Sequence, residues 1–270
     1  MDGLFKAMSF MTILQMGARS RELRREDMRS VLSWMSSTGA AVAVAGYAAA
    51  AVASWVTRGR SGAFAAVAAV AGMAAVTGFL HLDGLADSFD GLFAPGDRPR
   101  RLAIMREPRL GAFGVAALAL ALMAKAALVW AFLQPVAPVG GASSAPWFLA
   151  PLALAAAACA GRWTMLVAAA VGPYARPDSG TARIFIDEAS AAPLALGGIA
   201  PVALLAAALA MTGALHVLLV VPMAVLFATA GVLWGLVCRR QIGGQTGDTL
   251  GAAVEMGEIL ALALLVRAAL

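Results

Sequence analysis

Charged residues are scarce in this chain of 270 residues. Only 13% are Asp, Glu, Lys or Arg, and 61% are hydrophobic, whereas soluble domains are about 25% charged and about half apolar. This composition excludes an ordinary soluble domain and predicts an integral membrane protein. Tyrosine is also rare, with two residues, and segments of alternating polarity are lacking, which argues against a membrane β-barrel. Helices remain as the way to satisfy every backbone group in lipid, so the predicted fold class is all-α.

Cysteine is nearly lacking as well. Cys159 and Cys238 lie in or beside apolar segments without the spacing of metal ligands, which favours small packing residues. The net charge of +5 does not indicate nucleic acid as a partner, because the basic residues cluster in loops between apolar segments. There they set topology and meet anionic headgroups. We therefore expect membrane lipid around this chain, and no nucleic acid.

Long apolar segments are what the chain has in abundance. We expect one integral membrane domain, 1–270. Residues 1–18 should form an N-terminal helix that lies in the interface or partly inside the bundle, because the charged sequence RSRELRRED that follows is a poor signal-peptide cleavage region. Seven segments are long enough to cross a bilayer of about 30 Å. They are 33–56, 62–80, 111–133, 147–171, 191–212, 215–237 and 249–268.

Lysine and arginine predict the orientation of these spans. With the N-terminus inside, the cytoplasmic segments hold 15 of the 20 basic residues and the outer loops hold two, Arg58 and Arg60. This asymmetry follows the positive-inside rule. We expect a multi-pass protein of the cell inner membrane whose acidic segments both face the cytoplasm.

Three aspartates follow the second apolar segment. Asp83, Asp87 and Asp90 fall within about 60° of one another on a helical face. An acid near hydrocarbon costs about 2.5–3.5 kcal/mol on insertion scales, and like charges on one face repel unless a cation lies among them. Oxygen ligands favour a hard ion, so we predict Mg²⁺; a solvated helix end that carries acids by chance is the alternative. A packing role is favoured for His81 over a direct one.

A second acidic segment opens the last span with the sequence GGQTGD, residues 243–248. Glycines let backbone amides approach an anion, and the helix N-terminus adds partial positive charge. Asp248 is either a functional acid or an N-cap. An N-cap does not explain Glu255 and Glu258, which follow inside the apolar helix. Gly244, Thr246 and Glu255 are candidate substrate-binding residues.

Arginines between these segments are candidates for phosphate contacts, because the guanidinium fork matches phosphate oxygens. Arg106 and Arg109 lie one turn apart beside glycines at the entrance of a span. Arg162 lies inside a span, where an unpaired charge is unfavourable, so we expect an acidic partner or a substrate phosphate beside it.

The segments that carry these residues resemble the cobalamin-5′-phosphate synthase family, also called adenosylcobinamide-GDP ribazoletransferase. The resemblance rests on 81–91 (HLDGLADSFDG), 105–114 (MREPRLGAFG), Gly161-Arg162-Trp163 and 243–252 (GGQTGDTLGA). It is weaker near the start, where Ile13-Leu14-Gln15 stands in place of an Arg-Leu-Pro-like element.

The resemblance implies a transferase of cobalamin biosynthesis. The reaction joins the cobinamide phosphate of adenosylcobinamide-GDP to α-ribazole, or to α-ribazole 5′-phosphate, and releases GMP. Asp83, Asp87 and Asp90 would hold Mg²⁺ on the diphosphate with Asp248, and one aspartate would accept the hydroxyl proton. Arg106 and Arg109 would neutralise phosphate charge, and Arg162, Gly244, Thr246, Glu255 and His81 are the further substrate-binding candidates.

Two other functions compete with this one. A CDP-alcohol phosphotransferase also uses spaced aspartates at a membrane face, but its pattern needs an arginine soon after the second aspartate, and residues 87–90 (DSFD) contain none. A transporter for an anion or divalent cation would place acids near the bilayer midplane, whereas these lie at the ends of spans. The sequence leaves the oligomeric state open.

The orientation can be tested with reporter fusions. A reporter fused after residue 95 should be cytoplasmic, and one fused near residue 140 should be external, because the segment after the first position is rich in arginine and the loop around the second has no basic residue. Alkaline phosphatase and green fluorescent protein activities in whole cells measure the two locations. Reversal of the pair would overturn the predicted topology.

Overall fold

The computed structural model describes residues 2–16, 24–133, 149–176 and 181–269. These residues form helices and no strand, apart from an isolated parallel bridge between Tyr174 and Gln245. The predicted all-α membrane bundle is thereby confirmed. Short 3₁₀ helices precede α2 and α12. The α-helices are α1 (Asp2–Met11), α2 (Met28–Met35), α3 (Thr38–Val56), α4 (Gly62–Val76), α5 (Leu80–Phe93), α6 (Arg98–Ile104), α7 (Ala112–Leu133), α8 (Ala150–Ala169), α9 (Thr181–Asp187), α10 (Ala191–Gly197), α11 (Ile199–Thr212), α12 (Val220–Ile242) and α13 (Gly247–Ala269).

Six helical segments of the described chain are long and apolar enough to cross a membrane. They are α3, α7, α8, α10 with α11, the 3₁₀ turn with α12, and α13. The helices α4 and α5 pass the same test only as a pair, and they meet at an angle of 90°. The predicted number of seven spans holds if this bent pair counts as one.

The prediction of one continuous span over 62–80 is therefore wrong, because the helix ends before residue 80. The helix α4 ends at Val76, and Gly78 and Phe79 adopt left-handed backbone conformations with φ of 60° and 61°. A left-handed residue cannot continue a right-handed helix. The chain turns there, and α5 begins at Leu80 as a separate helix outside the six spans, which carries the first acidic segment.

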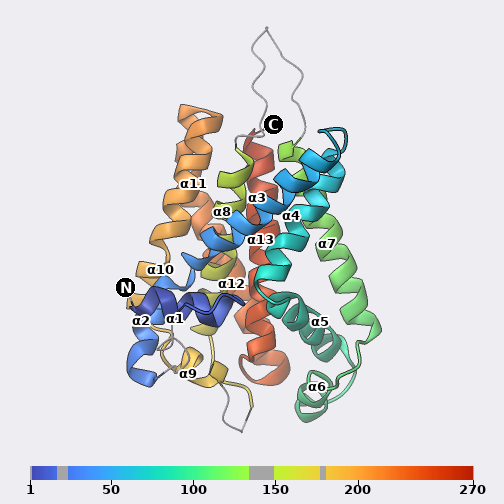
Figure 1. The fold of residues 1–270 in the computed structure, drawn as a ribbon. Helices are drawn as coiled ribbons and strands as arrows, with labels where there is room; N and C mark the ends of the chain where they lie inside the picture. Colours follow the sequence, from blue (N-terminus) through green and yellow to red (C-terminus); the bar gives the residue numbers. More distant parts are fainter. Residues whose placement is uncertain (1, 17–23, 134–148, 177–180, 270) are drawn as a thin grey trace.

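The N-terminal helix is shorter than predicted. The helix α1 ends at Met11, and ten residues rise only about 15 Å, too little for a bilayer. Ala7 and Met11 are buried in one core with Met28 of α2, and Figure 1 shows α1 lying across the long helices. The prediction of a helix that does not span is confirmed. Residues 1, 17 and 18 of that prediction, and residues 147–148 of the fourth span, lie outside the described residues.

The helices α8 and α13 run through the middle of the bundle, and glycines bring them together (Figure 1). A Cβ atom added at Gly161 of α8 would lie 2.6 Å from the carbonyl oxygen of Val254, and one at Gly257 would lie 2.7 Å from the Cα of Gly161. Neither contact leaves room for a side chain. Small residues at such crossings let helices pack closely in lipid, where no hydrophobic effect drives them together.

Four buried charges connect α13 to its neighbours beside this crossing. Lys125 of α7 donates to Glu255 at 2.9 Å and to Glu258 at 2.5 Å. Arg162 of α8 donates to Glu258 at 3.0 Å and to the carbonyl oxygen of Ala158 at 2.9 Å. Two cations balance two anions, so the charges of this buried charge network cancel. The acidic partner expected for Arg162 is Glu258.

Replacement of Lys125 by methionine should destabilise the fold. The change leaves two buried carboxylates with one arginine, and loss of one partner from a buried ion pair costs about 3–5 kcal/mol. Thermal unfolding in detergent should show a clearly lower midpoint, and Lys125→Met with Glu255→Gln should recover part of the loss. An unchanged midpoint for the single variant would contradict a stabilising role for the network.

Candidate active site

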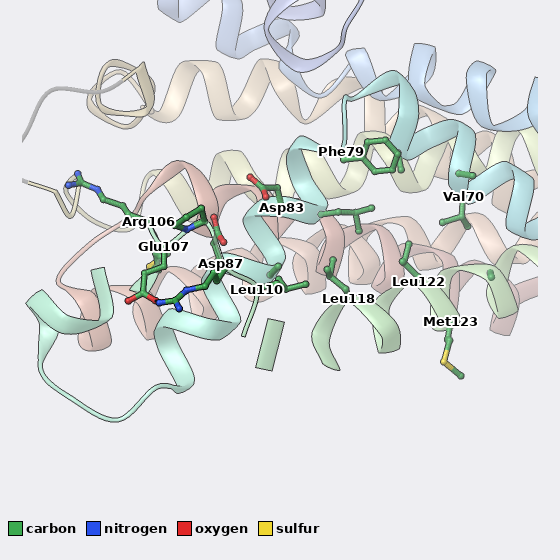
Figure 2. Close-up of a pocket in the computed structure, with 18 of the residues that line it drawn as sticks. Val70, Phe79, Asp83, Asp87, Arg106, Glu107, Leu110, Leu118, Leu122 and Met123 are labelled. Carbon is green, nitrogen blue, oxygen red and sulfur yellow. The ribbon is translucent and has the colours of Figure 1, made fainter. Parts of the chain in front are cut away.

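Asp83 and Asp87 lie one turn apart on α5, at the polar end of a pocket of about 920 Å³. Asp83 is exposed and Asp87 is half-buried. Arg106, Glu107 and Arg109, from the connection between α6 and α7, line the same end. Figure 2 shows Asp83, Asp87, Arg106 and Glu107 toward one end of the pocket, with the guanidinium of Arg106 directed away from the two acids, and apolar side chains along the other end. The structure thus brings two of the predicted acids and both predicted arginines to one pocket.

The rest of this pocket is apolar. The helix α4 contributes Val67, Val70, Ala71 and Ala74, and α7 contributes Leu118, Leu122, Met123 and Ala126. Several of these side chains are exposed along the side of the bundle, Met123 at 69%. The pocket therefore has a charged end beyond the spans and an apolar end between two helices of the membrane bundle.

The helix α13 brings Asp248 to the same acids. A Cβ atom added at Gly84 would lie 2.7 Å from the carbonyl oxygen of Asp248, so α5 and α13 cross in backbone contact. Asp248 accepts a hydrogen bond of 2.7 Å from Arg176, which follows α8. The prediction that distant aspartates converge holds for Asp83, Asp87 and Asp248.

The carboxylates affect one another electrostatically. Burial, reinforced by the charges of Asp83, Asp248 and Asp90, raises the pKa of Asp87 to about 7, and Arg176 opposes this shift. Like charges in a half-buried site favour a bound cation or proton. Among the described residues, no group of three or more His, Cys, Asp or Glu side chains is placed to hold a metal. Asp83 and Asp87 nevertheless suit Mg²⁺, which commonly takes one or two carboxylates together with substrate phosphates.

Asp90 has a different role from the predicted one. Its two carboxylate oxygens accept hydrogen bonds from the backbone N–H groups of Gly111, at 2.7 Å, and Gly114, at 2.8 Å. Gly111 directly precedes α7 and Gly114 lies in its first turn, where a carboxylate satisfies open donors and complements the helix dipole. A Cβ atom at either glycine would lie 2.3 Å from an Asp90 oxygen, so the glycines make room for the carboxylate. Asp90 caps α7, and it is buried away from the pocket.

Gly244 and Thr246 also have structural roles. The N–H of Gln245 donates to the carbonyl of Pro173, and the N–H of Ala175 donates to the carbonyl of Gln245. A Cβ atom at Gly244 would lie 2.0 Å from the Pro173 oxygen, so this pairing requires glycine. The buried Thr246 hydroxyl accepts from the N–H of Thr249 at 3.2 Å and caps α13, the role considered for Asp248.

The remaining candidates are buried and do not line the pocket. Arg162 and Glu255 belong to the buried charge network, with exposures of 0% and 5%, so the structure does not place them at the surface of the pocket. His81 is buried where α5 meets α13. The two helices are close there, because a Cβ atom added at Gly251 of α13 would lie 3.3 Å from the Cα of His81. Packing, the favoured role of His81, agrees with this position.

Arg176 is a site residue that sequence reasoning missed. Its neighbours in the sequence mark it only as one more cytoplasmic arginine. The signal lies in the fold, since the bridge between Tyr174 and Gln245 brings residues 173–176 alongside the start of α13. Its guanidinium thereby reaches the acids.

Comparisons with known proteins identify the family of this chain. A family model described as cobalamin-5-phosphate synthase matches residues 3–266. Relatives named adenosylcobinamide-GDP ribazoletransferase include those of Klebsiella pneumoniae (37% identity, 73% of each chain), Bradyrhizobium diazoefficiens (40%, 73% of this chain and 68% of the relative) and Sinorhizobium medicae (36%, 76% and 74%). No solved structure gives a significant match. The chain belongs to the cobalamin-5-phosphate synthase family.

Proposed function

We propose that this protein transfers the cobinamide phosphate of adenosylcobinamide-GDP to α-ribazole or α-ribazole 5′-phosphate, with release of GMP. Membership of the family supports this reaction. The observation that carries it in the structure is that Asp83, Asp87, Arg106 and Arg109 line the same pocket. Phosphoryl transfer asks a protein mainly for positioning and charge neutralisation, and these four side chains provide both.

The acids and the arginines have different roles in this reaction. A ribose hydroxyl oxygen attacks the cobinamide-bound phosphorus, and the bond from that phosphorus to the oxygen of GMP breaks. One of the pocket carboxylates accepts the hydroxyl proton. The arginines neutralise the phosphate oxygens. A Mg²⁺ ion held by Asp83 and Asp87 would supply further charge neutralisation on the diphosphate. Asp248 orients Arg176 toward the same oxygens.

The apolar end of the pocket suits the acceptor. The base of α-ribazole is a flat, largely apolar aromatic group, and the pocket walls from α4 and α7 are aliphatic. With the base between these helices, the ribose lies toward Asp83 and Asp87. Burial of apolar surface there holds the acceptor while its hydroxyl meets the charged end.

The location follows from the spans and the basic residues. The protein is a multi-pass membrane protein, and we place it in the cell inner membrane with the acids toward the cytoplasm, because 15 of its 20 basic residues then lie inside. Family membership does not favour the CDP-alcohol phosphotransferase or the transporter alternative.

Asp83→Asn and Asp87→Asn should each lower the rate of GMP release at least 100-fold, equivalent to about 2.7 kcal/mol of transition-state stabilisation. Each change removes a negative charge and preserves the size of the side chain. GMP formation from adenosylcobinamide-GDP and α-ribazole by the detergent-purified protein measures the effect. Asp97→Asn is the matched control, because Asp97 caps α6 away from the pocket and asparagine caps equally well. Near-normal rates for both pocket variants would remove these acids from the mechanism.

Removal of divalent cations should abolish the reaction. Treatment with EDTA should lower GMP release at least 100-fold, and Mg²⁺ or Mn²⁺ should restore it, because two carboxylates and a diphosphate need a cation between them. The Mg²⁺ concentration for half-maximal activity should rise in Asp83→Asn and stay unchanged in Asp97→Asn. Full activity in EDTA would exclude a metal-dependent transfer.

A further inference from the structure

A second pocket lies on the other side of Arg106. Its volume is about 570 Å³, and the described residues that line it include three arginines and an aromatic residue but no acid. Arg98 and Arg106 come from α6 and the connection after it, and Tyr174 and Arg176 come from the segment after α8. We call this the arginine pocket.

The fold orients two of these arginines individually. Arg98 donates to the carbonyl oxygen of Ala175 at 2.8 Å, and its guanidinium lies against Gly243, where an added Cβ would be 2.1 Å from the Nη1 atom. A neutral carbonyl holds Arg98 without cancelling its charge. Arg176 bonds to Asp248, with its side chain 15% exposed. Fixed, fork-shaped cations of this kind suit phosphate oxygens.

The two pockets share Arg106 and flank the acids. Arg106 lines both the arginine pocket and the pocket that contains Asp83 and Asp87. Arg176 lines the arginine pocket and touches Asp248, which lies within electrostatic reach of Asp83. A diphosphate at Arg106 would therefore extend one way toward the acids and the other way into the arginine pocket.

We propose that the arginine pocket binds the guanosine monophosphate half of the donor, the part that leaves as GMP. Arg98 and Arg176 contact its phosphate, and Tyr174 offers a ring face for the purine. The volume lies within the range of about 300–1,000 Å³ that is typical of small-molecule sites. Donor and acceptor then approach the acids from opposite sides. This inference takes the identity of the nucleotide from the proposed function and deepens it.

Direct binding of GMP tests the inference without turnover. Wild-type protein in nanodiscs of neutral lipid should bind GMP at least tenfold more tightly than inorganic phosphate, measured by isothermal titration calorimetry at constant ionic strength. Arg98→Ala should weaken GMP binding at least tenfold. Arg98→Lys keeps the positive charge but loses the two-pronged guanidinium, and it should weaken GMP binding several-fold. This variant keeps the test decisive if the alanine variant fails to fold.

Two further variants locate the site. Arg100→Ala is the matched control, because Arg100 belongs to the same helix, pairs with Glu107 and lines neither pocket. Its GMP affinity should stay within twofold of wild type. Leu122→Trp fills the apolar end of the other pocket and should also leave GMP binding unchanged. Weakened binding in Leu122→Trp with normal binding in both Arg98 variants would overturn the assignment.

The same titrations distinguish a nucleotide site from a site for simple anions or lipid headgroups. Phosphate that binds as tightly as GMP, or GMP binding that disappears in nanodiscs of anionic lipid, would reduce the pocket to an anion or headgroup site and overturn the proposal. Loss of GMP binding in Arg98→Ala without any transferase activity in wild type would support the pocket and contradict the proposed function. Transferase activity in the wild type, together with unchanged GMP binding in both Arg98 variants, would support the proposed function and contradict the assignment of the arginine pocket.

Discussion

The buried ion pairs of Lys125 and Arg162 with Glu255 and Glu258 are the constraint on which the site depends. They connect α13 to α7 and α8 inside a strongly apolar bundle. In lipid, a charge that loses its partner has no water to replace it, so these helices have one favourable alignment. Both α13 and α7 begin at the site, the first with Asp248 and the second at the amides bound by Asp90. The network therefore fixes the starting points of α7, which lines the pocket, and of α13, which carries Asp248.

Acids of similar appearance in the sequence serve distinct purposes in the fold. Asp83 and Asp87 line a pocket, Asp90 caps a helix, Asp248 pairs with an arginine, and Glu255 and Glu258 neutralise buried cations. Several of these contacts require glycine at the neighbouring position, because a side chain there would occupy the same space. Gly84 lets α13 cross α5 in contact, and Gly111 and Gly114 leave space for a carboxylate. The small residues beside the acids thus shape the site as much as the acids do.

The sequence predicted the parts of this arrangement that depend on local periodicity and composition. Apolar length predicted the spans, and the spacing of four residues placed Asp83 and Asp87 on one face of a helix. It could not predict the role of Asp90, because the amides that it caps are more than 20 residues away and are brought near by tertiary packing. Arg176 was missed for the same reason. The right-angled turn at Gly78 and Phe79 was hidden because both sides of it are apolar.

The position of the site between two environments explains why this chemistry suits a membrane protein. In the proposed reaction, an acceptor with an aromatic base meets a donor that carries a nucleotide diphosphate. The apolar end of the pocket that contains Asp83 and Asp87 lies between α4 and α7, among exposed apolar side chains of the bundle. The arginine pocket is formed by segments that connect the spans. A site at the boundary presents apolar walls to the aromatic base of the acceptor and guanidinium groups to the diphosphate of the donor. The donor therefore need not enter the apolar part of the bundle, and the acceptor need not pass through the arginine pocket. The right-angled turn into α5 places the acids at that boundary, where the two pockets share Arg106.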